Sequence, residues 1–210
     1  MAGVAARPQP RWGRLTAMAE PAPTPYISHA KYLALEEKSS TKHEWLAGVI
    51  YGIAGGTPDH AGLAAAVLGE LRNQLRGKRC RVYTADLKVR VLATGLSTYA
   101  DASVVCGGLE VDPDDKNAAT NPVVLVEVLS DSTEAYDRGE KFGHYRRIPS
   151  LAEYVLVSQR SPRIEVFRKN EAGKWVLAEE ASAGEVAPLL SIGCALAVDE
   201  VYADPLREVP

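Results

Sequence analysis

The 210-residue sequence has few cysteines, no long apolar run and no excess of basic charge. No stretch approaches the ~20 consecutive apolar residues that a spanning helix needs, which argues against an integral membrane protein. Lys and Arg number 24 against 27 Asp and Glu, and this net charge of −3 excludes a uniformly basic nucleic-acid coat, although a local basic patch stays open. The remaining composition, 46% hydrophobic and 24% charged, is that of a globular chain able to bury a core.

The three cysteines, Cys80, Cys106 and Cys194, are odd in number and form no C-x-x-C pair. This pattern argues against a disulfide scaffold and against a structural zinc site. We therefore expect a protein of the reducing cytoplasm.

Residues 1–25 combine three arginines with five prolines and show no hydrophobic period. The apolar stretch of a signal peptide is missing from this segment. We expect a disordered tail, or translation that begins at Met18, rather than a DNA-binding arm. A single domain over residues 26–205 should follow.

Within that domain, helix and strand patterns occur without the regular strand–helix alternation of a parallel α/β fold, so the sequence predicts the α+β class with one mixed sheet flanked by helices. Residues 107–121 read as a polar, acidic connection. Helices are expected over residues 28–37, 59–76 and 133–147, and strands over 44–53 (two around Ala47-Gly48), 81–83, 87–91, 99–105, 123–129, 151–158, 163–169, 174–179 and 188–196.

Glu127 interrupts the otherwise apolar run of residues 123–129, which is typical of a central strand covered on both faces. A carboxylate buried there costs several kcal/mol unless it is compensated. It can take up a proton, pair with a lysine or arginine, or hold a metal ion. The ion pair is the ordinary explanation, because the chain has 24 cationic side chains.

Asp101 lies at the start of the strand expected before the Glu127 strand. Two neighbouring strands would bring both carboxylates to one edge of the sheet, and hard cations such as Mg²⁺ favour such oxygen ligands. Taken alone, Asp101 is better explained as a turn or strand-start residue that bonds local amides.

The segment after the central strand places Asp137, Lys141 and either His144 or Tyr145 on one helical face. Lys141 could then reach Glu127. The alternative is an exposed Asp137–Lys141 pair on a solvated helix, which Gly139 and Gly143 would weaken by roughly 1 kcal/mol each. Two glycines also allow another backbone, or a phosphate chain, to approach closely.

Taken together, these motifs and their order resemble the Uma-two family of restriction-endonuclease-like proteins, within the PD-(D/E)XK nuclease superfamily. The resemblance extends over about residues 26–202. It implies a restriction-endonuclease-like fold and hydrolysis of nucleic acid. The matching motifs are Lys42-x-Glu44-x-x-x-Gly48, Pro58-x-His60, Tyr99-Ala100-Asp101, Val126-Glu127-Val128-Leu129-Ser130-x-Ser132-Thr133, Asp137-x-x-x-Lys141-x-x-x-Tyr145 and Glu153-Tyr154.

By this resemblance, Asp101 matches the aspartate of the PD motif and Glu127 the acidic residue of the second motif, which makes them the expected ligands of Mg²⁺, with Mn²⁺ as a substitute. Two positions depart from the pattern: Ala100 replaces the usual proline, and Leu129 stands where the superfamily often has lysine. The family tends to supply its lysine from the following helix, so Lys141 is the expected catalytic lysine and Lys88 a second candidate.

Four further side chains are expected near such a site. Glu44 is either an additional ligand or acceptor or a salt-bridge residue, and His60 is either a helix cap or part of the site's lining. Asp137 and Tyr145 share the Lys141 face. For DNA contact, the basic segment Arg138, Lys141, Arg146 and Arg147 is favoured over the cluster Arg72, Arg76, Lys78, Arg79 and Arg81.

The sequence thus leads to a hypothesis of a Mg²⁺-dependent endonuclease that acts on DNA. A homodimer is expected by superfamily analogy alone, because cutting two strands suits two sites. The alternative is a catalytically silent relative that binds nucleic acid or another protein, with Glu127 neutralised by Lys141. RNA is a third reading for the substrate.

Overall fold

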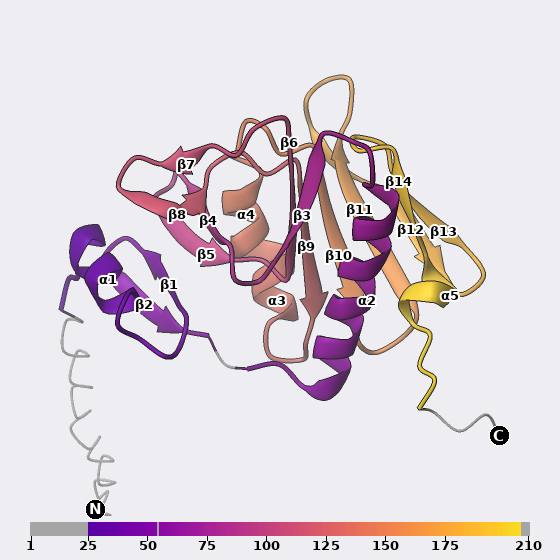
Figure 1. Ribbon diagram of the computed structural model, residues 1–210, viewed down its shortest axis with the longest axis horizontal. Coiled ribbons are helices and arrows are strands. Elements are labelled where there is room, and N and C mark those ends of the chain that lie inside the picture. The colour runs from indigo at the N-terminus through magenta and orange to yellow at the C-terminus, as the bar shows by residue number, and fades with distance from the viewer. Residues whose placement is uncertain (1–24, 54, 207–210) are drawn as a thin grey trace, which may run out of the picture.

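The computed structural model describes residues 25–53 and 55–206, so the expected tail over residues 1–25 lies outside the described residues except for Pro25. None of the helices in these ranges is long and apolar enough to cross a bilayer. The helices are α1 (His29–Glu36), α2 (Pro58–Gln74), α3 (Glu134–Tyr136), α4 (Phe142–Tyr145) and α5 (Val198–Val201), and a π-helical turn over Asp137–Lys141 joins α3 to α4 (Figure 1).

The strands divide between two six-stranded sheets and one hairpin. Sheet A has the order β2-β1-β5-β4-β8-β7, and comprises β1 (His43–Leu46), β2 (Val49–Gly52), β4 (Lys88–Val91), β5 (Leu96–Tyr99), β7 (Val111–Asp112) and β8 (Asp115–Ala119). Sheet B has the order β12-β11-β10-β9-β6-β3, and comprises β3 (Cys80–Thr84), β6 (Ala102–Cys106), β9 (Val124–Leu129), β10 (Glu153–Ser158), β11 (Arg163–Lys169) and β12 (Trp175–Ser182). The hairpin pairs β13 (Val186–Leu189) with β14 (Cys194–Ala197).

The predicted α+β class is confirmed, but the strands do not form the one sheet that was expected. Residues 107–121 contain β7 and β8 instead of a plain connection, the strand expected over 99–105 is two strands, β5 and β6, and the last extended segment is a hairpin. Helix α5 was not predicted. These elements are short, and most carry too few apolar residues for a period-2 or period-3.6 pattern to show.

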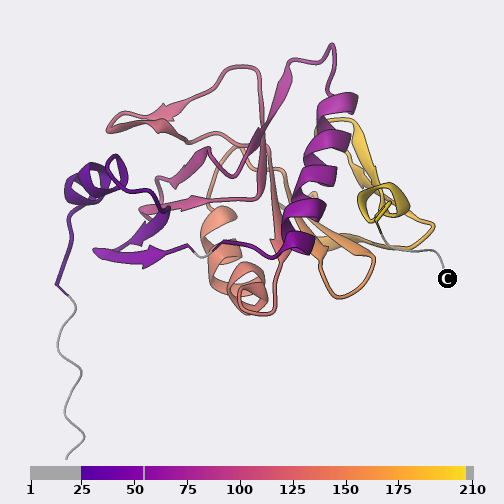
Figure 2. The same ribbon diagram turned by 60° about the horizontal axis from the view of Figure 1, so that its bottom comes forward.

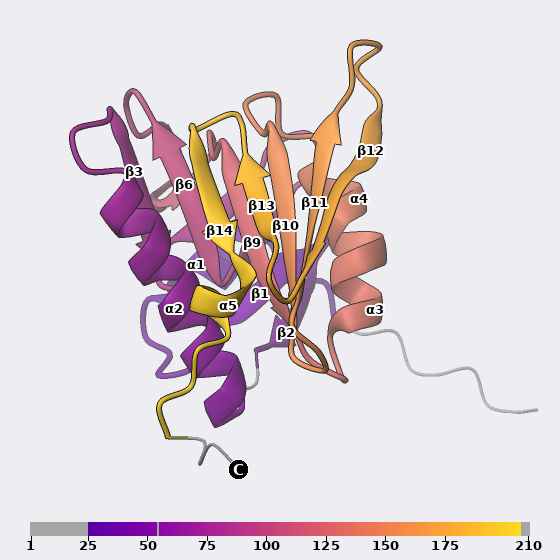
Figure 3. The ribbon, with the colours of Figure 1, turned by 90° about the vertical axis from the view of Figure 1, so that its right-hand side faces the viewer.

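Strand β9 is the centre of sheet B, and its two faces serve two separate cores. Val124, Val126 and Val128 pack with α2 and the β13–β14 hairpin. Leu125 and Leu129 pack on the opposite face with α4 and sheet A. Figure 3 shows α2 and the hairpin on one side of sheet B and α3–α4 on the other. Because side chains alternate along a strand, Glu127 points into the second core.

Sheet A lies beside that second core. Helix α1 and the β1–β2 hairpin occupy one end of the molecule, and the β13–β14 hairpin with α5 occupies the other (Figures 1 and 2). Strand β1 pairs with β5 through Trp45 and Ser97. The face of sheet A that carries Val89, Val91 and Leu96 packs into the second core.

A disulfide joins Cys80 to Cys106, contrary to the expectation drawn from the cysteine count. The two residues are direct partners in the antiparallel pairing of β3 with β6, which brings their side chains together on one face. Cys194 is free and buried. Spacing along the chain could not show this pairing, because the pair forms only when the sheet does.

Candidate functional site

Asp101 and Glu127 are cross-strand neighbours in sheet B. Ala102 of β6 pairs with Val126 of β9 in antiparallel register, and one further step sets Asp101 opposite Glu127. The backbone N–H of Val128 donates to Asp101 Oδ2 at 2.7 Å, which fixes Asp101 at the edge of the sheet. The structure thus brings the two predicted carboxylates to one place.

Lys141 lies in the π-helical turn and reaches three carboxylates. Its Nζ is 2.9 Å from Glu127 Oε1, 3.5 Å from Asp137 Oδ1 and 3.6 Å from Glu44 Oε1, and it donates to the carbonyl oxygen of Tyr99 at 3.1 Å. Burial opposes its charge, but the carboxylates outweigh this effect, Glu127 first, and raise the pKa of Lys141 well above its usual value. The exposed Asp137–Lys141 pair considered from the sequence is wrong, because both side chains are buried.

Glu127 receives two donors on the same oxygen. Lys141 Nζ and the hydroxyl of Tyr145 each lie 2.9 Å from Oε1. Burial raises the pKa of Glu127 well above its usual value, and Lys141 offsets this only in part. Burial also raises the pKa of Tyr145, with the charge of Glu127 next in effect. Burial therefore shifts Glu127 toward its neutral form, whereas the ammonium group of Lys141 favours the ionised form.

Glu44 enters the site from sheet A. Its carboxylate accepts from the hydroxyl of Thr98, and the hydroxyl of Tyr136 donates to Oε2 at 2.9 Å. Thr98 and Tyr136 were missed by the sequence reasoning. Both lack a motif of their own, and only the pairing of β1 with β5 and the position of α3 bring them to Glu44.

The site holds more buried negative charge than Lys141 can balance. Glu44, Glu127 and Asp137 surround the one ammonium group, and the charge of Asp101 further raises the pKa of both Glu127 and Asp137, whose largest perturbation is burial. A bound cation would remove the need for protonation. This imbalance is the electrostatic property that a divalent metal site requires.

The ligand set fits Mg²⁺ better than a metal that needs a full protein cage. Within residues 25–53 and 55–206, no group of three or more His, Cys, Asp or Glu side chains is arranged to enclose an ion. Mg²⁺ keeps several waters and uses only one or two carboxylates. Asp101 and Glu127 would supply these two.

His60 reaches Asp101 from the first turn of α2. Its Nε2 lies 3.2 Å from Asp101 Oδ2, and this contact, outweighing burial, raises the pKa of His60. The helix cap is Thr57, whose Oγ1 accepts from the backbone N–H of His60 at 3.2 Å. The imidazole itself therefore does not cap α2 and belongs to the lining of the site.

A surface pocket opens over Asp101. Lys42 contributes the positive charge of its wall, with Nζ 2.6 Å from Asp86 Oδ1 and 5.5 Å from the centre of the Tyr99 ring. The sequence reasoning quoted Lys42 as part of a motif but did not assign it to the site. The pocket is lined by Ser40, Thr41, Lys42, Ile53, Gly55, Gly56, His60, Ala85, Tyr99 and Asp101.

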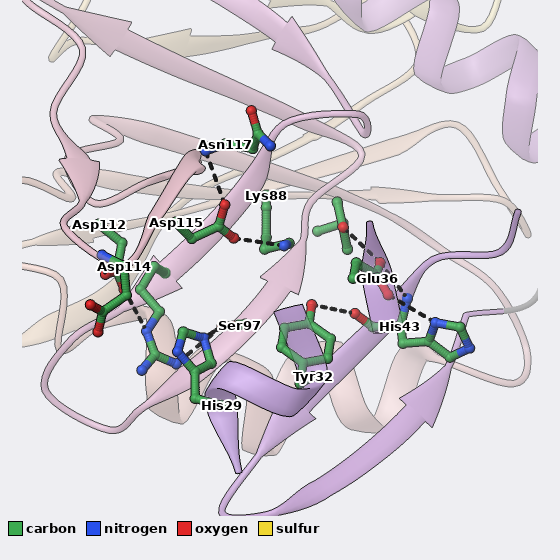
Figure 4. Close-up of polar contacts among 12 residues, drawn as sticks. His29, Tyr32, Glu36, His43, Lys88, Ser97, Asp112, Asp114, Asp115 and Asn117 are labelled. Carbon is green, nitrogen blue, oxygen red and sulfur yellow. Dashed lines mark hydrogen bonds and ion pairs between the residues drawn. The ribbon is translucent and has the colours of Figure 1, made fainter. Parts of the chain in front are cut away.

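Lys88, the second lysine candidate, lies in a different cluster. Its Nζ is 2.7 Å from Asp115 Oδ2, and Asp115 Oδ1 accepts from the backbone N–H of Asn117 at 3.0 Å. Lys88 Nζ also lies 5.1 Å from the centre of the Tyr32 ring, and Figure 4 shows the Lys88–Asp115 pair near Tyr32. Lys141 is therefore the lysine that the structure brings to Glu127.

The basic residues expected to contact DNA are divided by the fold. Arg138 binds Glu165 through its guanidinium and Glu134 through Nε at 2.8 Å, so its charge is already balanced within the protein. Arg146 and Arg147 are exposed beyond α4. The second cluster lies in the last turn of α2 and just beyond it, whereas the site lies at the N-terminal end of this helix. The cluster consists of Arg72, Arg76, Lys78, Arg79 and Arg81.

Comparison with known proteins gives a consistent result. Residues 29–199 match the Uma2 family model, described as "Putative restriction endonuclease". Two relatives come from Synechocystis sp. The uncharacterized protein slr1290 is 39% identical, and the match covers 86% of this chain and 94% of that protein. The uncharacterized protein sll1609 is 31% identical, and the match covers 75% of this chain and 89% of that protein. The crystal structure of a "putative nuclease belonging to DUF820" from Anabaena variabilis has the same fold, with TM-score 0.65, 14% identity, and coverage of 82% of this chain and 95% of that one.

Proposed function

The chain belongs to the Uma2 family, and from that premise we propose that it is a metal-dependent endonuclease that hydrolyses DNA phosphodiester bonds. One observation carries the proposal: Asp101 and Glu127 meet across adjacent strands, with Lys141 Nζ 2.9 Å from Glu127. Two carboxylates beside one lysine are the groups that metal-assisted phosphodiester hydrolysis needs.

Asp101 and Glu127 would hold Mg²⁺ or Mn²⁺. When bound, the ion neutralises charge that develops on the phosphate and acidifies water. Lys141 adds a fixed positive charge from the protein, which stabilises the transition state electrostatically and orients the attacking water. The hydroxyl of Tyr145 also donates to Glu127 Oε1 at 2.9 Å, which keeps the carboxylate in one orientation.

The pocket over Asp101 is the proposed entry for the scissile phosphate. Lys42 and His60 line this pocket beside the proposed metal position. Exposed Arg146 and Arg147 would contact the backbone further along the strand. Such contacts are sequence-independent and weaken with salt.

A second candidate function follows from the Lys141–Glu127 ion pair. Lys141 compensates part of the buried charge of Glu127 without any metal. A catalytically silent relative that binds nucleic acid or protein would need such compensation. Against it stands the excess of carboxylates around Lys141, which a protein without a metal has no reason to maintain.

A nicking assay on supercoiled plasmid separates the two candidates. With Mg²⁺ or Mn²⁺ we expect nicking that chelation stops and that Glu127→Gln and Asp101→Asn each reduce by about 10³-fold, because each removes a ligand charge from the metal. Glu171→Gln, an exposed carboxylate in the turn between β11 and β12, is the matched control and should retain full activity.

The outcomes of the assay are distinct. Equal nicking by the unmodified protein and Glu127→Gln would place the activity elsewhere or in a contaminant. No nicking, together with DNA binding that is independent of metal, would support the silent relative. Cleavage of RNA but not of plasmid would identify RNA rather than DNA as the substrate. Light scattering of the same sample tests the proposed homodimer.

A further inference from the structure

Asp101 is held by two donors on one of its oxygens, and we propose that His60 is the positioning residue that fixes which oxygen Asp101 presents to the metal. This inference rests on the proposed function. Val128 N–H lies 2.7 Å from Oδ2 and His60 Nε2 lies 3.2 Å from the same atom. Among the described residues, both contacts fall on Oδ2, so Oδ1 is the oxygen directed to a metal.

The imidazole of His60 is itself held from two sides. Its backbone N–H is bound by the Thr57 cap at the start of a 17-residue helix that packs on sheet B, so the Cα position is fixed. On the other side, a Cβ built on Gly56 would lie 2.7 Å from His60 Nδ1. Only glycine at position 56 lets the ring keep this place.

Without His60, the Val128 N–H would be the one remaining donor to Asp101 among the residues that the structure describes. The terminal torsion of an aspartate is broad and roughly two-fold, so a single donor does not determine which oxygen faces the site. The His60 contact adds a second direction and restricts that rotation. Groups that orient a metal ligand through its other atoms typically change metal affinity or activity 10–100-fold when removed.

The geometry also gives His60 a place at the substrate entrance. Its side chain and that of Asp101 are 20% and 18% exposed, respectively, and both line the pocket that contains Lys42. A residue that served only to pack α2 would have no reason to reach the rim of this pocket. We therefore assign it to Asp101 rather than to the core.

Titration calorimetry with Mn²⁺ tests the assignment. His60→Leu removes the donor and should weaken Mn²⁺ affinity by about 10–100-fold. His60→Gln keeps an N–H that can donate to Asp101 and should recover most of the affinity. In plasmid nicking, kcat should fall in His60→Leu while KM for DNA changes little, because the phosphate contacts remain. His144→Leu, at a half-buried histidine whose described ion pair is a 4.0 Å approach to Glu140, is the matched control.

A second variant keeps the test valid if His60→Leu fails to fold. Gly56→Ala leaves the imidazole present but displaces it, and should weaken Mn²⁺ binding in the same direction. Wild-type Mn²⁺ affinity in folded His60→Leu would overturn the His60 assignment and leave the metal site standing. No Mn²⁺ binding by the unmodified protein would overturn the metal site, and the role of His60 with it.

Discussion

Two glutamates on neighbouring strands of sheet B, Glu127 on β9 and Glu153 on β10, are almost equally buried, at 3% and 0% exposure, yet they are compensated very differently. Glu153 Oε1 accepts from Arg168 Nε at 2.7 Å and from Leu190 N–H at 3.0 Å. Its Oε2 accepts from the N–H of Ser191 at 3.1 Å and from the hydroxyl of the same residue. Both oxygens of Glu153 are thereby used to fix the turn between β13 and β14.

Glu127 has two donors on one oxygen and shares its lysine with two other carboxylates. The comparison shows that burial alone does not distinguish a functional carboxylate. A structural one has a complete set of donors, whereas a site carboxylate has a charge that the protein balances only in part. A buried charge that is only partly balanced costs stability, and we expect it to be maintained where a bound ligand completes the balance.

The largest expected effect separates the two glutamates by stability. Glu153→Gln should lower the free energy of unfolding by about 3–5 kcal/mol, because it breaks a buried ion pair. Arg168 and the backbone N–H of Ser191 would then lose the negative charge to which they donate. Glu127→Gln should lower the free energy of unfolding by less, because Lys141 still has the carboxylates of Asp137 at 3.5 Å and Glu44 at 3.6 Å as partners. Urea unfolding of both variants without metal measures the difference.

This distinction between the two glutamates fails if Glu153→Gln and Glu127→Gln lower the free energy of unfolding by similar amounts. In that case Glu127 would be as structural as Glu153, and its ion pair with Lys141 would be part of the folding energy rather than of a site. Glu171→Gln, at an exposed turn position, is again the neutral reference.

A somewhat smaller effect is expected from the disulfide, which stabilises sheet B without touching either glutamate. Loop closure over the 26-residue separation of Cys80 and Cys106 predicts a loss of about 3 kcal/mol on reduction or in the Cys80→Ser/Cys106→Ser double variant. Thermal unfolding with and without reductant measures it. Reduction that leaves the melting temperature unchanged would show that the cross-link is absent in solution, and the double variant should be insensitive to reductant in either case.

The smallest effect concerns pH. Burial raises the pKa of Glu127 and Asp137 above their usual values, so the folded protein holds protons that the unfolded chain releases. The stability that these protons contribute is complete below about pH 4 and is lost as pH rises through the folded pKa. We expect the metal-free protein to lose stability from these groups as the pH rises above about 4.

The variants isolate this contribution. Glu127→Gln should show a smaller decline with pH than the unmodified protein, and Mn²⁺ should stabilise the unmodified protein more at pH 8 than at pH 5, because binding displaces the proton. Identical pH profiles for the unmodified protein and Glu127→Gln would contradict the raised pKa. His60, whose pKa is also raised, contributes to both profiles equally.

Much of the fold was predictable because its signals are local. The apolar run around Glu127 predicted a central strand, and the helical spacing from Leu63 to Leu75 predicted α2 within two residues at its C-terminal end. Strands β7 and β8 were missed because their stability comes from pairing in sheet A, and a stretch such as Asp115–Ala119 has no period of its own.

The candidate site was predictable to the extent that charge stood out against its surroundings. Glu127 was conspicuous in an apolar strand, whereas Glu153 was named only as part of the Glu153-Tyr154 motif, with no expectation of burial. Its burial depends on a turn nearly 40 residues further along the chain, at Leu190 and Ser191. No local pattern indicates that contact.

The amino-acid sequence by itself determined the central strand, the long helix and the presence of an acidic group where water is excluded, because these follow from short-range periodicity and from the cost of burying charge. The tertiary structure alone decided which lysine reaches Glu127, that Glu44 joins it from another sheet and that Cys80 meets Cys106. Those contacts depend on strand register and on the packing of one sheet against another, and both are set by interactions between segments distant in the chain.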